Sequence, residues 1–85
     1  MKLRVLYFAA LREALGCEGE TVEPPATVAT LGELRVWLAR RGGVWAEALA
    51  PGRNLRAALG QRLARADTAL VDGAEVAFFP PVTGG

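Results

Sequence analysis

Histidine and serine are absent from the 85 residues of the sequence, and cysteine and lysine each occur once. Without histidine or serine, the chain cannot form a Ser-His-Asp relay, a Cys-His pair or an imidazole metal site. Cys17 has no partner for an internal disulfide, which excludes a disulfide-stapled secreted scaffold and favours a reducing, cytoplasmic location. Any chemistry that this chain supports therefore has to use a different reactive group.

The sequence also lacks an excess of charge and a long hydrophobic run. Ten basic and nine acidic residues give a formal net charge of +1, which argues against a dedicated nucleic-acid binder. No apolar run approaches the about 20 residues that a transmembrane helix needs, so no membrane partner is expected. Hydrophobic residues make up 52% of the chain and charged residues 22%, a composition typical of one small folded domain.

The N-terminal part of the chain predicts a strand, a helix and a second strand. Residues 2–9 alternate in a way that is typical of a strand. Residues 9–15 are strong helix formers and stop at Gly16, a residue type that is common just after a helix. Residues 20–23 favour a second strand, which must end at the two prolines that follow because proline cannot donate to a ladder.

The main helix is expected to begin at Thr30. Thr30 and Glu33 have the spacing of a capping box, in which each side chain accepts a hydrogen bond from the other residue's backbone amide. The apolar residues that follow on one face are Leu31, Leu34 and Leu38. The two glycines at 42–43 end the helix.

The C-terminal half predicts a short helix and three further strands. Residues 44–49 favour the helix, and residues 55–65 favour two short strands around a turn at 60–61. Asp72-Gly73 is a strong tight-turn signal, and residues 75–79 favour the last strand. This order of elements predicts an α+β domain in which a sheet packs on one main helix.

Two adjacent aromatic pairs, Tyr7-Phe8 and Phe78-Phe79, fall on predicted strands. Because successive side chains of a strand point to opposite faces, each pair sends one ring to each face. Tyr7 and Phe78 are expected in the core, and Phe8 and Phe79 on the face that the helix leaves open. The other apolar residues on that face are Leu6 and Ala77. We interpret the open face as a partner interface, the alternative being that a loop half-covers the terminal rings.

The last six residues, 80–85, read PPVTGG. The prolines favour an extended conformation, so this tail is expected to project from a domain formed by residues 1–79. Six extended residues reach roughly 20 Å, and Gly84 and Gly85 can enter a channel too narrow for a side chain. The reactive group that the tail would deliver is the terminal carboxylate of Gly85.

A carboxylate becomes reactive when it is converted to an acyl adenylate, and a sulfur donor could then turn it into a thiocarboxylate. The chain contains no Walker-type phosphate-binding loop, so both steps need a partner enzyme. In this hypothesis the active group is the end of the chain, which explains the absence of catalytic side chains.

Residues 72–85, DGAEVAFFPPVTGG, resemble the end of the small subunit of molybdopterin synthase, a family of sulfur carriers with a ubiquitin-like β-grasp fold. The resemblance extends over the whole chain and includes VLYFA at 5–9, LRE at 11–13 and Thr30-Leu31. It implies an α+β fold in which a mixed sheet packs on one main helix, followed by a flexible C-terminal Gly-Gly tail.

The resemblance also implies a function. Gly85 would be adenylated by an ATP-using enzyme that resembles ubiquitin-activating enzymes, converted to a thiocarboxylate by way of a sulfur donor protein, and inserted into the large synthase subunit. There it would donate sulfur to cyclic pyranopterin monophosphate, within a heterotetramer. The chain itself would bind no metal and no cofactor and would have no independent activity. The residues expected to contact partners are Gly84, Thr83, Val82, Pro81, Pro80, Phe79, Phe8 and Leu63. If the large subunit and the activating enzyme use the same surface, their complexes exclude each other.

Three alternatives stay open. The chain could be a sulfur carrier for thiamin synthesis or tRNA thiolation, a ubiquitin-like modifier joined to target lysines through Gly85, or an interaction module without chemistry. Separately, four arginines stand close together in the sequence: Arg53, Arg56, Arg62 and Arg65. We interpret them as a solvated face of the late strands that nearby acids offset, the alternative being that they dock an acidic surface.

Overall fold

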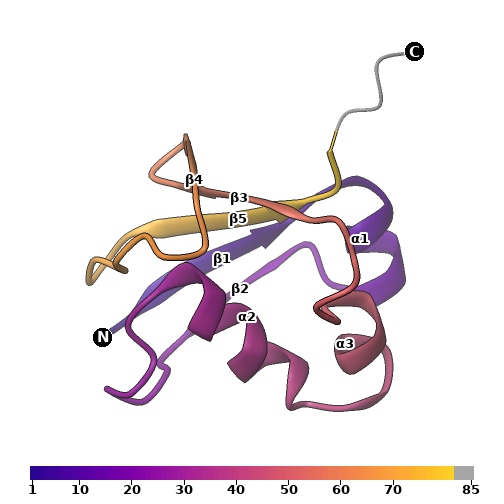
Figure 1. The fold of residues 1–85 in the computed structure, drawn as a ribbon, viewed down its shortest axis with the longest axis horizontal. Coiled ribbons are helices and arrows are strands. Elements are labelled where there is room, and N and C mark those ends of the chain that lie inside the picture. Colours follow the sequence, from indigo (N-terminus) through magenta and orange to yellow (C-terminus); the bar gives the residue numbers. More distant parts are fainter. Residues whose placement is uncertain (82–85) are drawn as a thin grey trace.

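The computed structural model describes residues 1–81 and contains one five-stranded sheet with three helices. The elements are β1 (Leu3–Tyr7), α1 (Ala9–Leu15), β2 (Gly19–Val22), α2 (Leu31–Ala39), α3 (Gly43–Ala48), β3 (Arg56–Leu59), β4 (Arg62–Ala64) and β5 (Glu75–Phe79). In Figure 1, α2 and α3 lie below the sheet and α1 lies at its right-hand end. None of the helices in the described part of the chain is long and apolar enough to cross a bilayer.

The sheet is mixed, with the strand order β2-β1-β5-β3-β4. Its central pair, β1 and β5, is parallel, and the other three pairs are antiparallel. The first and last strands of the chain therefore lie side by side in the middle of the sheet (Figure 1). The predicted α+β class and the predicted elements are confirmed, with boundaries that differ by one or two residues.

The core lies between the sheet and the helices. Leu3, Val5 and Tyr7 of β1 are fully buried and share a face with Val76 and Phe78 of β5. Leu31, Leu34 and Leu38 on the predicted apolar face of α2 are also buried, and Trp37 and Trp45 pack against this core. The alternation that placed Tyr7 and Phe78 inside is therefore confirmed.

The start of α2 is fixed by the predicted capping box. The Thr30 hydroxyl accepts a hydrogen bond from the Glu33 amide at 3.2 Å, and the Glu33 carboxylate accepts one from the Thr30 amide at 3.1 Å. The next two amides of α2 donate to the loop after β4: Leu31 to the Thr68 carbonyl and Gly32 to the Ala66 carbonyl. A Cβ atom at Gly32 would lie 3.2 Å from two atoms of Ala66, so glycine allows this close approach.

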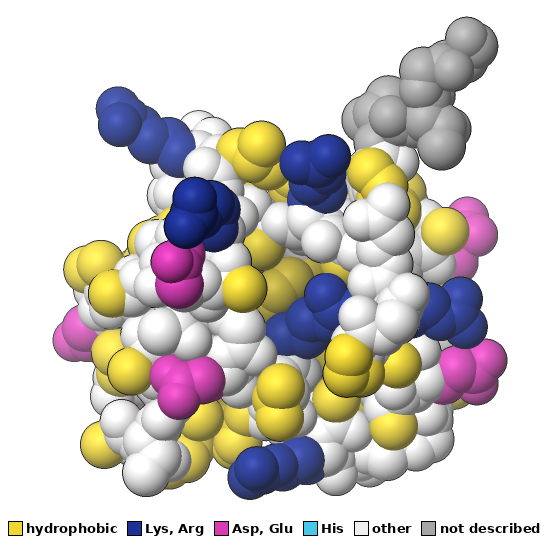
Figure 2. All heavy atoms as spheres, viewed as in Figure 1, with side chains coloured by type: hydrophobic (Ala, Val, Ile, Leu, Met, Phe, Trp, Pro, Cys, Tyr) yellow, Lys and Arg dark blue, Asp and Glu magenta, His cyan; other side chains and the backbone are white. Residues whose placement is uncertain are grey.

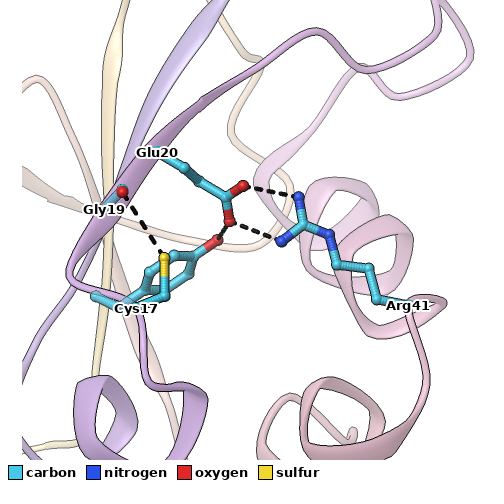
Figure 3. A network of polar contacts seen from close by, with 5 residues as sticks. Cys17, Gly19, Glu20 and Arg41 are labelled. Atoms are coloured by element: carbon cyan, nitrogen blue, oxygen red, sulfur yellow. Dashed lines mark hydrogen bonds and ion pairs between the residues drawn. The ribbon is translucent and has the colours of Figure 1, made fainter.

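A polar network joins β1 and β2 to the loop between α2 and α3 (Figure 3). The Tyr7 hydroxyl donates to Glu20 at 2.9 Å, and both ends of the Arg41 guanidinium donate to the same carboxylate at 2.7 and 2.9 Å. Arg41 also lies 4.3 Å from the centre of the Trp45 ring. Hydrogen bonds from Arg41 lower the pKa of Glu20, and burial raises the pKa of Tyr7. The network stabilises the buried Tyr7 hydroxyl by giving it a charged acceptor.

Candidate functional site

The face of the sheet opposite the helices carries a row of apolar residues. Leu6 of β1 pairs with Ala77 of β5, Ala77 pairs with Ala58 of β3, and Ala58 pairs with Leu63 of β4. Residues that pair directly across strands point to the same face. The row therefore runs across four strands, and it ends at the edge of the sheet with Leu63, whose residue surface is 65% exposed.

A second row lies beside the first, closer to the end of the chain. Phe79 of β5 pairs with Arg56 of β3, and the amide of Phe8 donates to the Phe78 carbonyl at 3.2 Å, which continues the pairing of β1 with β5. Phe8 is 45% exposed and Phe79 is half-buried. We call the two rows the open-face patch, formed by Leu6, Phe8, Ala58, Leu63, Ala77 and Phe79. Phe8, Phe79 and Leu63 thus lie on the same face of the sheet, and their contact with a partner stays a prediction.

The backbone is strained directly after Phe8. Ala9, the first residue of α1, has a φ of +54°, in the left-handed region that favours glycine. This conformation costs an alanine about 1–2 kcal/mol. It turns the chain sharply from β1 into α1 and leaves Phe8 at the end of the strand, on the open face. No glycine in the sequence signals this turn, and the sequence prediction missed it.

The neck of the tail begins at the edge of the open-face patch. Pro80 and Pro81 follow Phe79 directly, and both are half-buried. Pro80 lines a groove of about 360 Å³ between α1 and α3, where Leu11 and Ala48 are among its neighbours. The remaining predicted site residues, Val82, Thr83, Gly84 and Gly85, and the predicted projection of the tail lie outside the described residues.

The described residues hold few groups for side-chain chemistry. Within residues 1–81, no three histidine, cysteine, aspartate or glutamate side chains are grouped so that they could hold a metal ion. The Cys17 thiol lies 3.7 Å from the Gly19 carbonyl oxygen, to which it donates (Figure 3). The main candidate site is therefore the apolar patch together with the tail that starts at its edge.

A sequence model of the ThiS family matches residues 5–85. The chain belongs to this family. It is 46% identical over 83 residues to the molybdopterin synthase sulfur carrier subunit of Escherichia coli, a match that covers 98% of this chain and 99% of that protein. The family resemblance predicted from the C-terminal residues is confirmed.

Solved structures of relatives share the fold. A putative molybdopterin converting factor subunit 1 from Pyrococcus furiosus matches with a TM-score of 0.78 and 27% identity, over 96% of this chain and 99% of that one. A protein–protein complex of subunits 1 and 2 of the molybdopterin-converting factor from Helicobacter pylori matches with a TM-score of 0.66 and 28% identity, over the full length of both chains. The predicted ubiquitin-like β-grasp fold is confirmed.

Proposed function

We propose that this chain is the sulfur carrier subunit of a molybdopterin synthase and that the carboxyl group of Gly85 carries the sulfur. The observation that supports this most strongly is the 46% identity to a protein of that name over nearly the whole of both chains. The family match also extends to residue 85 and so includes the Gly-Gly end.

The proposed chemistry uses three steps at one carbon atom. The Gly85 carboxylate attacks the α-phosphorus of ATP on an activating enzyme and releases pyrophosphate. Sulfide supplied by a donor then attacks the acyl carbon, the bond between that carbon and the phosphate oxygen breaks and AMP leaves, which gives a thiocarboxylate. Transfer of that sulfur to cyclic pyranopterin monophosphate breaks the carbon–sulfur bond, and an oxygen from water restores the carboxylate. ATP is bound by the activating enzyme, and this chain needs no cofactor of its own.

The large subunit of the synthase is the proposed docking partner. The structure from Helicobacter pylori is a complex of two molybdopterin-converting factor subunits, one of which has the fold of this chain. The open-face patch is a suitable surface because two large exposed apolar side chains, those of Phe8 and Leu63, lie on it and because it adjoins the neck at Pro80. Four residues extend from Pro81 to the end, a reach of at most about 14 Å. Docking at the patch would therefore hold the tail within a short distance of the partner's active site.

Two further parts of the proposal concern assembly and location. One small subunit at each end of a large-subunit dimer would form a heterotetramer. The activating enzyme and a sulfur donor protein complete the set of partners, and if the activating enzyme uses the same patch, loading and donation alternate. The use of ATP by the activating enzyme and the single free cysteine fit a cytoplasmic location.

Reconstitution with the large subunit tests this proposal. Chemically thiocarboxylated carrier is mixed with the large subunit from the same organism and cyclic pyranopterin monophosphate, and molybdopterin is measured as its fluorescent oxidation product. We expect product only with the thiocarboxylated chain, and none when Gly85 is deleted although the deleted chain still binds. Product formation by the Gly85-deleted chain would contradict the proposal. If the chain supported tRNA thiolation or thiamin synthesis but formed no molybdopterin, it would instead be a sulfur carrier for one of those two pathways.

A further inference from the structure

A cleft of about 400 Å³ opens at the β4 edge of the sheet. Its walls are formed by the start of α2, by residues 54–57 and by residues 63–66. Its floor includes Leu31 and Phe78. Figure 2 shows a hollow near the middle of the view, with apolar atoms inside it and basic side chains beside it. The cleft therefore combines an apolar floor with a charged rim.

The charge of the rim has one sign. Among the described residues, those that line the cleft include three arginines, Arg35, Arg56 and Arg65, and no carboxylate. Of these three arginines, only Arg65 has an ion-pair partner within residues 1–81. That partner is Asp67 at 3.2 Å, and the side chains of the pair are 85% and 73% exposed. An exposed pair of this kind is worth little, so Arg65 can turn to another carboxylate at small cost.

Arg35 is held in place as a fixed positive charge. Its guanidinium donates to the carbonyl oxygens of Leu49 at 2.9 Å, Arg53 at 2.8 Å and Ala50. Partial burial lowers the pKa of Arg35, because no carboxylate offsets the desolvation of its charge. The amides at the start of α2 are already bonded to Thr68, Ala66 and Thr30. An anion in the cleft would therefore meet guanidinium groups and not the end of the helix.

The cleft adjoins the open-face patch at the β4 edge of the sheet. Leu63 ends the apolar row across the sheet and also lines the cleft. Arg56 pairs with Phe79 in the second row and lines the cleft as well. The floor residue Phe78 lies on the helix side of the sheet, opposite the patch, so the two surfaces meet only around the edge formed by β4. A segment of a partner that covers the patch has to pass around this edge to enter the cleft.

We infer that the cleft receives an acidic segment of the protein that docks on the open-face patch. The segment would place one or more carboxylates against Arg56 and Arg65 at the rim of the cleft. The inference rests on the proposed function, because it extends the docking surface of the proposed large-subunit complex. For two of the four arginines that are close in sequence, Arg56 and Arg65, the inference favours the alternative that they dock an acidic surface. Arg53 and Arg62 do not line this cleft.

A protein segment suits the cleft better than a nucleic acid does. The whole chain carries a net charge of only +1, so the positive charge is local and does not form the extended basic face that nucleic-acid binders present. The one aromatic ring in the lining, Phe78, is 2% exposed and offers no surface for base stacking. Carboxylates held by arginine forks above an apolar floor match the observed lining.

Affinity measurements with charge-reversal variants test the inference. The probe is the recombinant large subunit of molybdopterin synthase from the same organism, titrated with the full chain by calorimetry at two salt concentrations. We expect Arg56→Glu and Arg65→Glu each to raise Kd by about tenfold or more, because a carboxylate would then face a carboxylate. Arg40→Glu is the matched control, since Arg40 is an exposed arginine at the end of α2 that does not line the cleft. Its Kd should stay within about twofold of the wild type.

The outcomes separate this inference from the proposed function. If the wild-type chain binds and both cleft variants bind within about twofold of it, the cleft receives no acidic segment, although the proposed function stands. If the wild-type chain does not bind the large subunit at all, the proposed function fails with it. Arg56→Gln and Arg65→Gln, which add no repulsion, should weaken binding less and reduce its salt dependence, and their melting temperatures verify folding.

A titration with inorganic phosphate examines a small anion as the other occupant. The guanidinium Nε–H signals of Arg35, Arg56 and Arg65 are followed by NMR at constant ionic strength. The inference would be overturned by two results together: these three signals shift and saturate below about millimolar phosphate, and the charge reversals have no effect on large-subunit binding. The cleft would then be assigned to a small anion. Weak shifts that do not saturate are expected.

Discussion

Replacement of Phe8 by alanine tests whether the open-face patch is the docking surface. Phe8 is 45% exposed, and a phenylalanine presents about 200 Å² of surface, so docking would remove roughly 90 Å² of apolar surface from water. At about 25 cal/mol per Å² this corresponds to roughly 2 kcal/mol, or about thirtyfold in Kd. Alanine keeps a small part of that area, so we expect Kd for the large subunit to rise by about ten- to thirtyfold.

The substitution should leave the fold intact. Phe8 is the N-cap residue of α1, but its side chain makes no capping hydrogen bond, so alanine removes only the buried half of the ring's packing. We expect a loss of about 1–2 kcal/mol in the free energy of unfolding, which circular dichroism can follow. Leu63→Ala is the second variant, because a side chain that is mostly exposed contributes little to the core and should affect binding more than stability.

Val36→Ala serves as the matched control for the binding assay. Val36 is also about half exposed, but it lies on α2, on the side of the sheet away from the patch. Calorimetry with the large subunit should therefore give an unchanged Kd. If Phe8→Ala and Leu63→Ala both bind within about threefold of the wild type, the partner docks elsewhere and the assignment of the patch is wrong.

The remaining predictions concern stability, measured by urea unfolding. Glu20→Ala should lower the free energy of unfolding by about 2–3 kcal/mol, because both Tyr7 and Arg41 lose their acceptor. Tyr7→Phe should lower it by only about 1 kcal/mol. Equal losses for the two variants would show that the network is not coupled as described. Because the pKa of Glu20 is lowered in the folded state, its charge stabilises the fold above the unfolded pKa of about 4.3. That contribution is lost as the pH falls through the lowered pKa of the folded state, so the difference in unfolding free energy between the wild type and Glu20→Gln should shrink on acidification. A difference that does not change down to pH 2 would contradict this prediction. Ala9→Gly should be neutral or stabilising by up to about 1 kcal/mol, since it relieves a positive φ, while Ala14→Gly in the same helix should cost about 1 kcal/mol. A loss at Ala9 as large as that at Ala14 would mean that the backbone there is not strained.

Local patterns in the sequence were sufficient to predict much of the fold. The alternation around Tyr7-Phe8 and Phe78-Phe79 separates the rings in the core from those on the open face, because the period of a strand is local. The Thr30–Glu33 capping box depends on a spacing of three residues, and it is present in the structure as predicted. The family resemblance could also be recognised, since it is carried by a continuous string at the end of the chain.

Features that depend on strand register or on long-range contacts were not predicted. Ala58 joins the apolar row only because β3 pairs with β4 and β5 in one particular register, and four residues of β3 do not specify that register. Glu20 and Arg41 are 21 residues apart, so no local spacing relates them. The cleft brings Arg35 of α2 beside Arg56 and Arg65, a juxtaposition that exists only after α2 has packed against the end of β4.

The most direct test of the central claim is the intact mass of the chain purified from its native host during synthesis of the molybdenum cofactor. We expect a species whose mass corresponds to replacement of one oxygen by sulfur, with the change located at Gly85 by fragmentation. Cells without the activating enzyme should contain only the unchanged chain. Absence of the sulfur in producing cells would contradict the role as a sulfur carrier, and so would a main product in which the chain is linked through Gly85 to lysines of other proteins.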